Sequence, residues 1–149
     1  MIHKILIIED EQELATILQR FLTKKKFHVQ TAQSLREGFQ KLNVEPFDAL
    51  ILDNNLPDGK GVEHISDIKK IHTNIIVVAM SALQMREVAL RAGADYFVEK
   101  PISLQGIEAV LVEKTTTPNQ TIQAVSRHKA KKSPAIQGES HDFTNKPSE

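Results

Sequence analysis

The sequence of 149 residues contains no cysteine. The chain can therefore form no disulfide, no thiolate metal site and no cysteine nucleophile, which fits a reducing compartment. It also has no excess of either charge, because 19 lysines and arginines balance 19 aspartates and glutamates. A balanced chain produces no overall field that would attract nucleic acid or an anionic membrane, so any electrostatic function must be local.

Long apolar runs are absent as well. No run approaches the roughly 18 residues that a membrane-spanning helix needs, and the first residues, Met1 to Lys4, lack the charged and apolar regions of a signal peptide. We therefore expect a cytoplasmic protein that does not bind membranes. With 40% hydrophobic residues, a chain of this length can build one domain with a real core, but not two.

What the chain does have is an apolar run, Ala49 to Leu52, that leads directly into Asp53. An uninterrupted run of this kind is typical of a strand buried on both faces of a parallel sheet. Pro57 and Asp58-Gly59 then predict a turn, so the next helix should begin no earlier than about Lys60. Because open α/β sheets bind ligands at the C-terminal ends of strands, we expect Asp53 to be reactive, at a loop mouth and partly open to solvent.

The rest of the chain alternates between short apolar runs and amphipathic patterns. The apolar runs predict strands at 4–8, 27–31, 49–52, 75–79 and 96–98. Apolar residues that recur every three or four positions predict helices at 14–22, 35–42, 62–71, 83–92 and 104–111. Five such pairs indicate an α/β fold: a doubly wound, five-stranded parallel sheet of the flavodoxin-like (βα)5 type with right-handed crossovers.

The apolar runs also predict the strand order. The first, third and fourth runs are continuously apolar, as central strands are, whereas the second and fifth are mixed, as edge strands are. This agrees with the order 2-1-3-4-5, which places the ends of the first and third strands side by side.

The helical and strand patterns stop at about Thr115, where small polar residues and proline take over. We therefore expect a domain at 1–114 and a polar, mostly disordered tail at 115–149. A basic patch within the tail, Arg127 to Lys132, could contact nucleic acid or acidic partners, although such patches are more often simply solvated.

Five residues with polar reactive groups end or follow the predicted strands: Glu9, Asp10, Asp53, Ser81 and Lys100. The predicted topology brings all of them to one edge of the sheet. Neighbouring carboxylates repel unless a cation neutralises them, and hard oxygen ligands suit Mg²⁺. The hydroxyl and the ammonium suit the oxygens of a phosphoryl group. The set predicts Mg²⁺-dependent phosphoryl transfer onto Asp53, although a single Asp at this position would more often just end a strand and cap a turn.

Residues 1 to about 114 resemble the receiver domain of bacterial response regulators. Besides the acidic pair and Asp53, the resemblance includes Pro57 and Gly61, the Ser81-Ala82 pair, Gly93-Ala94-Asp95 and Lys100-Pro101. The chain departs from the family pattern at Glu9, where Asp is common. Its longer arm could alter the affinity for the metal.

The resemblance also implies roles for individual residues. Asp53 would be the phosphoacceptor, Asp10 a direct Mg²⁺ ligand and the backbone carbonyl of Asn55 a further ligand, while Glu9 would act on the metal through water. Ser81 and Lys100 would bind the phosphoryl group, and Phe97 would occupy the aromatic switch position.

The implied function is that of a stand-alone switch. It would accept a phosphoryl group from a sensor histidine kinase or a phosphotransfer protein, and would catalyse only its own phosphorylation and dephosphorylation. We expect phosphorylation to draw Ser81 toward the new oxygens and Phe97 into the space vacated beneath the fourth helix. The face of the fourth helix, fifth strand and fifth helix, with apolar residues such as Val110 and Val112, would then bind a downstream protein or form a homodimer.

Three other functions are compatible with parts of the pattern. A receiver-like docking module that is never phosphorylated would not need the complete set of reactive residues. A phosphatase with an aspartyl nucleophile would generally need a second acid where this chain has Asn55. A regulator acting on DNA through the basic tail would be expected to carry a helix-turn-helix pattern, and none is present.

Overall fold

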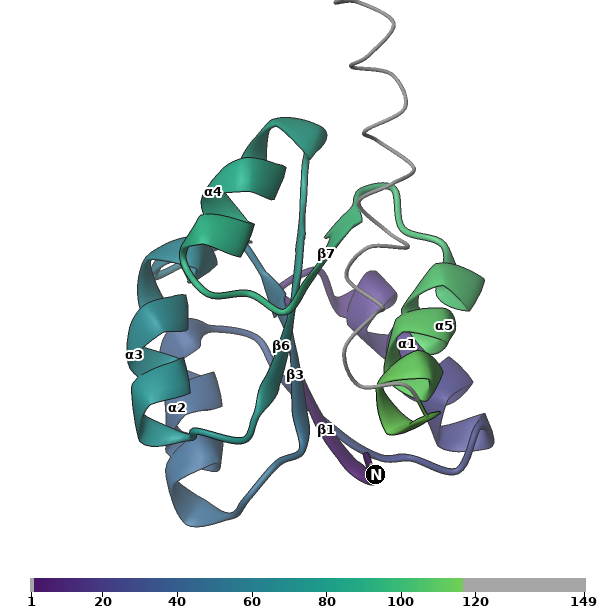
Figure 1. Ribbon diagram of the computed structural model, residues 1–149. Helices are drawn as coiled ribbons and strands as arrows, with labels where there is room; N and C mark the ends of the chain where they lie inside the picture. Colours follow the sequence, from purple (N-terminus) through teal and green to yellow (C-terminus); the bar gives the residue numbers. More distant parts are fainter. Residues whose placement is uncertain (1, 117–149) are drawn as a thin grey trace, which may run out of the picture.

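A parallel sheet of five strands with helices on both faces forms the described part of the computed structural model, residues 2–116 (Figure 1). The strands of this sheet are β1 (Lys4–Ile8), β2 (His28–Ala32), β3 (Ala49–Asp53), β6 (Ile76–Ser81) and β7 (Tyr96–Glu99). The α-helices are α1 (Gln12–Lys24), α2 (Leu35–Val44), α3 (Ile65–Ile71), α4 (Arg86–Arg91) and α5 (Leu104–Thr116). The expected tail lies outside the described residues, except for its first two residues, which end α5.

The strand order is β2-β1-β3-β6-β7, with every neighbouring pair parallel. Two short segments, β4 (Asn55–Leu56) and β5 (Gly59–Lys60), form a separate antiparallel hairpin, so β6 and β7 are the fourth and fifth strands of the main sheet. The predicted order 2-1-3-4-5 and the flavodoxin-like α/β fold are therefore confirmed. The hairpin, which lies where the sequence indicated only a turn, was not predicted.

The strand β3 is buried along its whole length, as its apolar run predicts. Alternation sends Leu50 and Leu52 into the core beneath α2, α3 and α4, and Ile51 into the core beneath α1 and α5. Burying a leucine or isoleucine side chain completely stabilises the fold by about 1.5–3 kcal/mol. The strand β3 therefore packs into a core on each face of the sheet, and its C-terminal residue, Asp53, lies at the end of this doubly buried strand.

Two of the helices begin differently from the prediction. The expected helix at 62–71 starts with a 3₁₀ turn, η1 (Gly61–His64), and the one at 83–92 with another, η2 (Leu83–Met85). In η2 the N–H of Met85 donates to the carbonyl of Ala82, which is the tighter spacing of a 3₁₀ helix.

Within residues 2–116 there is no helix with the length and apolar character that a membrane crossing requires.

Candidate functional site

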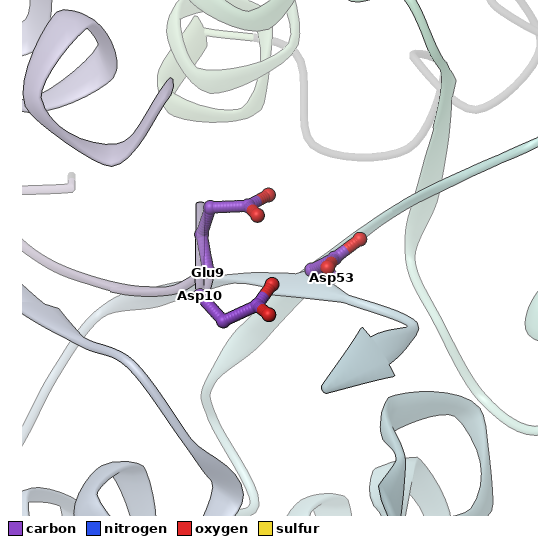
Figure 2. A group of neighbouring side chains, drawn as sticks. All are labelled: Glu9, Asp10 and Asp53. Carbon is purple, nitrogen blue, oxygen red and sulfur yellow. The ribbon is translucent and has the colours of Figure 1, made fainter. Parts of the chain in front are cut away.

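Three carboxylates meet at the C-terminal ends of the adjacent strands β1 and β3 (Figure 2). Ile8 pairs with Leu52 in the sheet, so the residues that follow them, Glu9 and Asp53, come side by side. Figure 2 shows the side chains of Glu9 and Asp10 extending toward the side on which Asp53 lies. One oxygen of each carboxylate lies within 4.8 Å of the other two. The predicted acidic cluster is therefore present as a compact set of hard oxygen donors.

The three carboxylates differ in their exposure to solvent. Asp53 is 3% exposed and Glu9 1% exposed, whereas Asp10 is exposed. The expectation that Asp53 would be partly open at a loop mouth is therefore wrong. Asp53 is the last residue of β3, and Gly61 packs so closely on its carbonyl that a Cβ at Gly61 would lie 2.3 Å from that oxygen. The chain after β5 folds back over the end of β3 and covers it.

Lys100 places its ammonium group between two of the carboxylates. Its Nζ lies 2.9 Å from Asp53 Oδ1 and 3.2 Å from Glu9 Oε1. The backbone N–H of Lys100 donates to the carbonyl of Ser81, which ties the end of β7 to the end of β6. Burial lowers the pKa of Lys100, but the hydrogen bonds and charges of Asp53 and Glu9 outweigh this and raise the pKa above 10.5. Lys100 is therefore a fixed positive charge at neutral pH.

Both carboxylate oxygens of Glu9 accept hydrogen bonds from the chain itself. Oε2 accepts from the backbone N–H of Glu11 at 3.0 Å, and Oε1 accepts from Lys100. Burial raises the pKa of Glu9 above its ordinary value of 4.5, and the charge of Asp53 raises it further, against the effects of Glu11 N–H and Lys100. Ionised Glu9 is thus held in place, but at a cost in free energy.

This raised pKa gives a pH-dependent contribution to stability. The folded state holds the Glu9 proton more tightly than the unfolded chain does, so the stabilisation is complete below pH 4.5 and is lost as the pH rises through the folded-state pKa. We expect Glu9→Gln to lack this loss. Urea denaturation in EDTA measures this. As the pH rises from 4.5 to 7.5, the unfolding free energy of the natural chain should fall relative to that of the variant. A constant difference across this range would contradict the prediction.

Ser81 lies at the end of β6, and Phe97 is buried in the core. Ser81 is the last residue of β6 and is 5% exposed. It directly follows Met80, which pairs with Asp53 in the sheet. Phe97 is 2% exposed and belongs to the core that contains Ala79 and Ala89 of β6 and α4. Phe97 therefore already lies inside this core in the structure, and its movement on phosphorylation stays a prediction.

The predicted apolar face of α4, β7 and α5 is only partly correct. Val110 is 2% exposed and packs into the core beneath α1 and α5, because it lies on the same side of α5 as Ile107. Val112 is 44% exposed, and Leu83 and Val88, at the start of and within the α4 region, are 41% and 44% exposed. Val110 therefore does not contribute to an exposed apolar face, whereas Val112 on α5 does.

Asn54 is a residue of the site that the sequence analysis missed. It is 8% exposed, its Oδ1 accepts from the N–H of Val62 at 3.0 Å, and its carbonyl accepts from the N–H of Gly61 at 2.9 Å. These two bonds close the loop that carries Asn55, which is exposed and lies two residues beyond Asp53. The sequence did contain a signal for Asn54, because it is a polar residue between the buried strand that ends at Asp53 and the turn predicted at Pro57.

The sequence matches a known protein family over most of its length. The family model described as "Response regulator receiver domain" matches residues 5–112. The transcriptional regulatory protein KdpE of Staphylococcus aureus is 33% identical over 109 residues, which are 71% of this chain and 47% of KdpE. The chain thus spans less than half the length of this relative.

Solved structures show the same fold. The crystal structure of a two-component response regulator from Clostridium difficile has a TM-score of 0.74 and 26% identity, and the match covers 79% of this chain and 99% of that one. The solution structure of the beryllofluoride-activated NtrC4 receiver domain dimer has a TM-score of 0.69 and 28% identity, and the match covers 74% and 93% of the two chains.

Proposed function

Because the chain belongs to the response regulator receiver domain family of two-component signalling, we propose that it is a cytoplasmic switch in which Asp53 accepts a phosphoryl group. The observation that carries this proposal is the position of Lys100, whose ammonium bridges buried Asp53 and buried Glu9 beside exposed Asp10. A lysine fixed in this way can contact an oxygen of a phosphoryl group attached to Asp53.

The donor set fits Mg²⁺. Among the described residues, only Lys100 forms ion pairs within the group of three carboxylates, whose oxygens lie within 4.8 Å of one another, and carboxylate oxygens are ligands that Mg²⁺ prefers. We assign Asp10, Asp53 and the backbone carbonyl of Asn55 as ligands. Glu9, with both oxygens already bonded to Glu11 and Lys100, would act through water. When bound, the ion would neutralise the negative charge that develops on the phosphoryl oxygens during transfer.

The transfer itself requires a nucleophile and two groups that bind the phosphoryl oxygens. A carboxylate oxygen of Asp53 forms a bond to phosphorus, while the bond from phosphorus to the donor's histidine nitrogen breaks and its electron pair stays with that nitrogen. Lys100 holds one phosphoryl oxygen by charge, and the Ser81 hydroxyl donates to another. The donor would be a histidine kinase or a phosphotransfer protein, and water would later hydrolyse the product. The chain thus acts catalytically only on itself.

The output of the switch would be a change in protein contacts. Leu83, just before α4, and Val112, on α5, are exposed apolar side chains on two elements of the predicted α4–β7–α5 face, which is the candidate site for a downstream protein or for a second copy of the chain. The receiver domain of NtrC4, which is 28% identical, is a dimer in its activated form.

Ser81→Ala should separate phosphorylation from this output. The variant keeps Asp53 and Lys100 and should still accept a phosphoryl group, but it lacks the hydroxyl that would be drawn toward the new oxygens. We expect the amide chemical shifts of residues 83–112 to change on phosphorylation of the natural chain and to change much less in the variant. Equal changes in both proteins would mean that the signal leaves the site by another route.

Uptake of label from acetyl phosphate tests the proposed function. With Mg²⁺ present, the natural chain should become labelled, and EDTA or Asp10→Asn should reduce labelling at least tenfold, because the loss of even an outer-shell partner of a metal ligand typically lowers metal affinity or activity by about 10- to 100-fold. A chain that stays unlabelled under all conditions would instead be a docking module with a receiver fold.

A further inference from the structure

The turn of the β4–β5 hairpin is bound to the start of α2. Asp58 lies between the two short strands, and its Oδ1 accepts from the backbone N–H of Leu35 and its Oδ2 from that of Arg36, both at 2.9 Å. Leu35 and Arg36 are the first two residues of α2, where N–H groups have no acceptor within the helix. One carboxylate from a distant part of the sequence therefore satisfies two donors of the helix.

The N-cap residue of α2 serves a different donor. Ser34 Oγ accepts from the N–H of Glu37 at 3.1 Å, so the start of α2 has one cap from its own N-cap residue and another from the hairpin. The hydrogen bonds from Leu35 and then Arg36 lower the pKa of Asp58 below its ordinary value of 3.8. Asp58 is therefore ionised at neutral pH, and its negative charge suits the positive end of the helix dipole.

Packing connects the same two elements. Gly59 has a φ of +151°, and a Cβ at this position would lie 3.0 Å from Cδ1 of Leu35. Leu35 is 3% exposed, and Leu56 of β4 packs against the core that contains it. The hairpin therefore lies directly against the first turn of α2.

Asn55, whose carbonyl is the proposed Mg²⁺ ligand, lies between two anchor points of this hairpin. At the base, the N–H of Gly61 donates to the carbonyl of Asn54 at 2.9 Å. At the tip, Asp58 binds α2. Asn55 itself is exposed and pairs with Lys60 of the opposite strand. The position of its carbonyl therefore depends on how both ends of the hairpin are held.

We infer that Asp58 is a positioning residue for the metal site: by binding the hairpin to α2, it holds the carbonyl of Asn55 where Mg²⁺ requires a ligand. The inference rests on the proposed function, in which this carbonyl binds the ion. Mg²⁺ demands near-ideal octahedral geometry, so a ligand that loses its support binds the ion less well. Residues that orient a metal ligand typically account for about 10- to 100-fold in metal affinity.

Titration of the full chain with Mg²⁺, followed by amide chemical shifts, measures this effect. Asp58→Ala removes both hydrogen bonds to α2 and should raise the Kd for Mg²⁺ about tenfold. Asp58→Asn keeps one acceptor oxygen and should have an intermediate Kd. Ser34→Ala is the matched control, because it removes a cap from the same end of α2 but leaves the contacts of the hairpin in place. It should leave the Kd unchanged.

Amide hydrogen exchange in EDTA provides a measurement that does not involve the ion. The N–H groups of Gly61 and Val62 both donate to Asn54 at the base of the hairpin. They should exchange faster in Asp58→Ala than in the natural chain, because the hairpin has lost its other anchor. Ser34→Ala should leave both exchange rates unchanged.

An equal Kd for Mg²⁺ in Asp58→Ala and Ser34→Ala, or equal exchange at the base of the hairpin, would show that Asp58 only caps α2. Either result would overturn the inference and leave the proposed function intact. If the natural chain binds no Mg²⁺ and accepts no phosphoryl group, the proposed function fails, and the inference fails with it.

Discussion

Lys100→Met should lower the free energy of unfolding by about 2–3 kcal/mol at pH 7 in EDTA, because it leaves two buried carboxylates without a positive charge. Asp53 and Glu9 are 3% and 1% exposed, and Lys100 Nζ lies within 3.2 Å of both. The value is below the 3–5 kcal/mol typical of a fully buried pair, since the Lys100 side chain is 30% exposed and water already screens part of the interaction. Urea denaturation followed by circular dichroism measures the change.

Lys25→Met is the matched control, because it removes the same charge from a surface ion pair. Lys25 lies 3.4 Å from Glu108, and its side chain is 43% exposed. An exposed pair of this kind contributes about 0–1 kcal/mol. If the two variants unfold at the same urea concentration, Lys100 does not stabilise the site in the way described. Added Mg²⁺ should restore part of the stability lost in Lys100→Met, since a cation bound only by the folded state stabilises it.

Gly61→Ala should both destabilise the domain and slow phosphorylation. A Cβ at this position would lie 2.3 Å from the carbonyl oxygen of Asp53 and 3.0 Å from Cγ of Leu52, so the backbone must shift. Overpacking of this kind costs about 2–3 kcal/mol, which corresponds to a melting temperature lower by about 10 °C. The shift also moves the loop that carries Asn55, and with it a proposed ligand of Mg²⁺, so uptake of phosphoryl groups from acetyl phosphate should fall at least tenfold.

Gly106→Ala shows how much of this effect comes from the added methyl group alone. At Gly106 in α5 the nearest atom to a new Cβ is Ser103 Cβ at 3.5 Å, an ordinary contact. Alanine is also the better helix former by roughly 1 kcal/mol, so this variant should be as stable as the natural chain or more so. A Gly61→Ala protein that melts and reacts like Gly106→Ala would show that the close packing on Asp53 is not required.

The sequence was sufficient to predict which residues meet at the edge of the sheet. Uninterrupted apolar runs such as Ala49 to Leu52 indicate strands buried on both faces, and the alternation of strands and helices then determines a parallel order. Once β1 and β3 are neighbours, Glu9, Asp10 and Asp53 must be close, whatever the details of the loops. These predictions succeed because they depend on periodicity and on the strand order of the flavodoxin-like fold, which the resemblance to receiver domains also implies.

Burial within the site could not be predicted in the same way. Gly61 packs on the carbonyl of Asp53 and the N–H of Val62 donates to Asn54 Oδ1, and both contacts depend on the path of an irregular loop beside the buried Asp53. Hydrophobic periodicity contains no information about that path. The burial of Val110 could have been predicted, since it lies three residues after Ile107 and on the same side of the helix.

The most direct test of the central claim is to identify the residue that carries the phosphoryl group. After reaction with acetyl phosphate and Mg²⁺, reduction with borohydride converts a phosphorylated aspartate to homoserine, which peptide mass spectrometry can locate. We predict homoserine at position 53 and at no other aspartate, and none in Asp53→Asn or in a sample treated with EDTA. Homoserine at another position, or an equal yield in EDTA, would contradict the account.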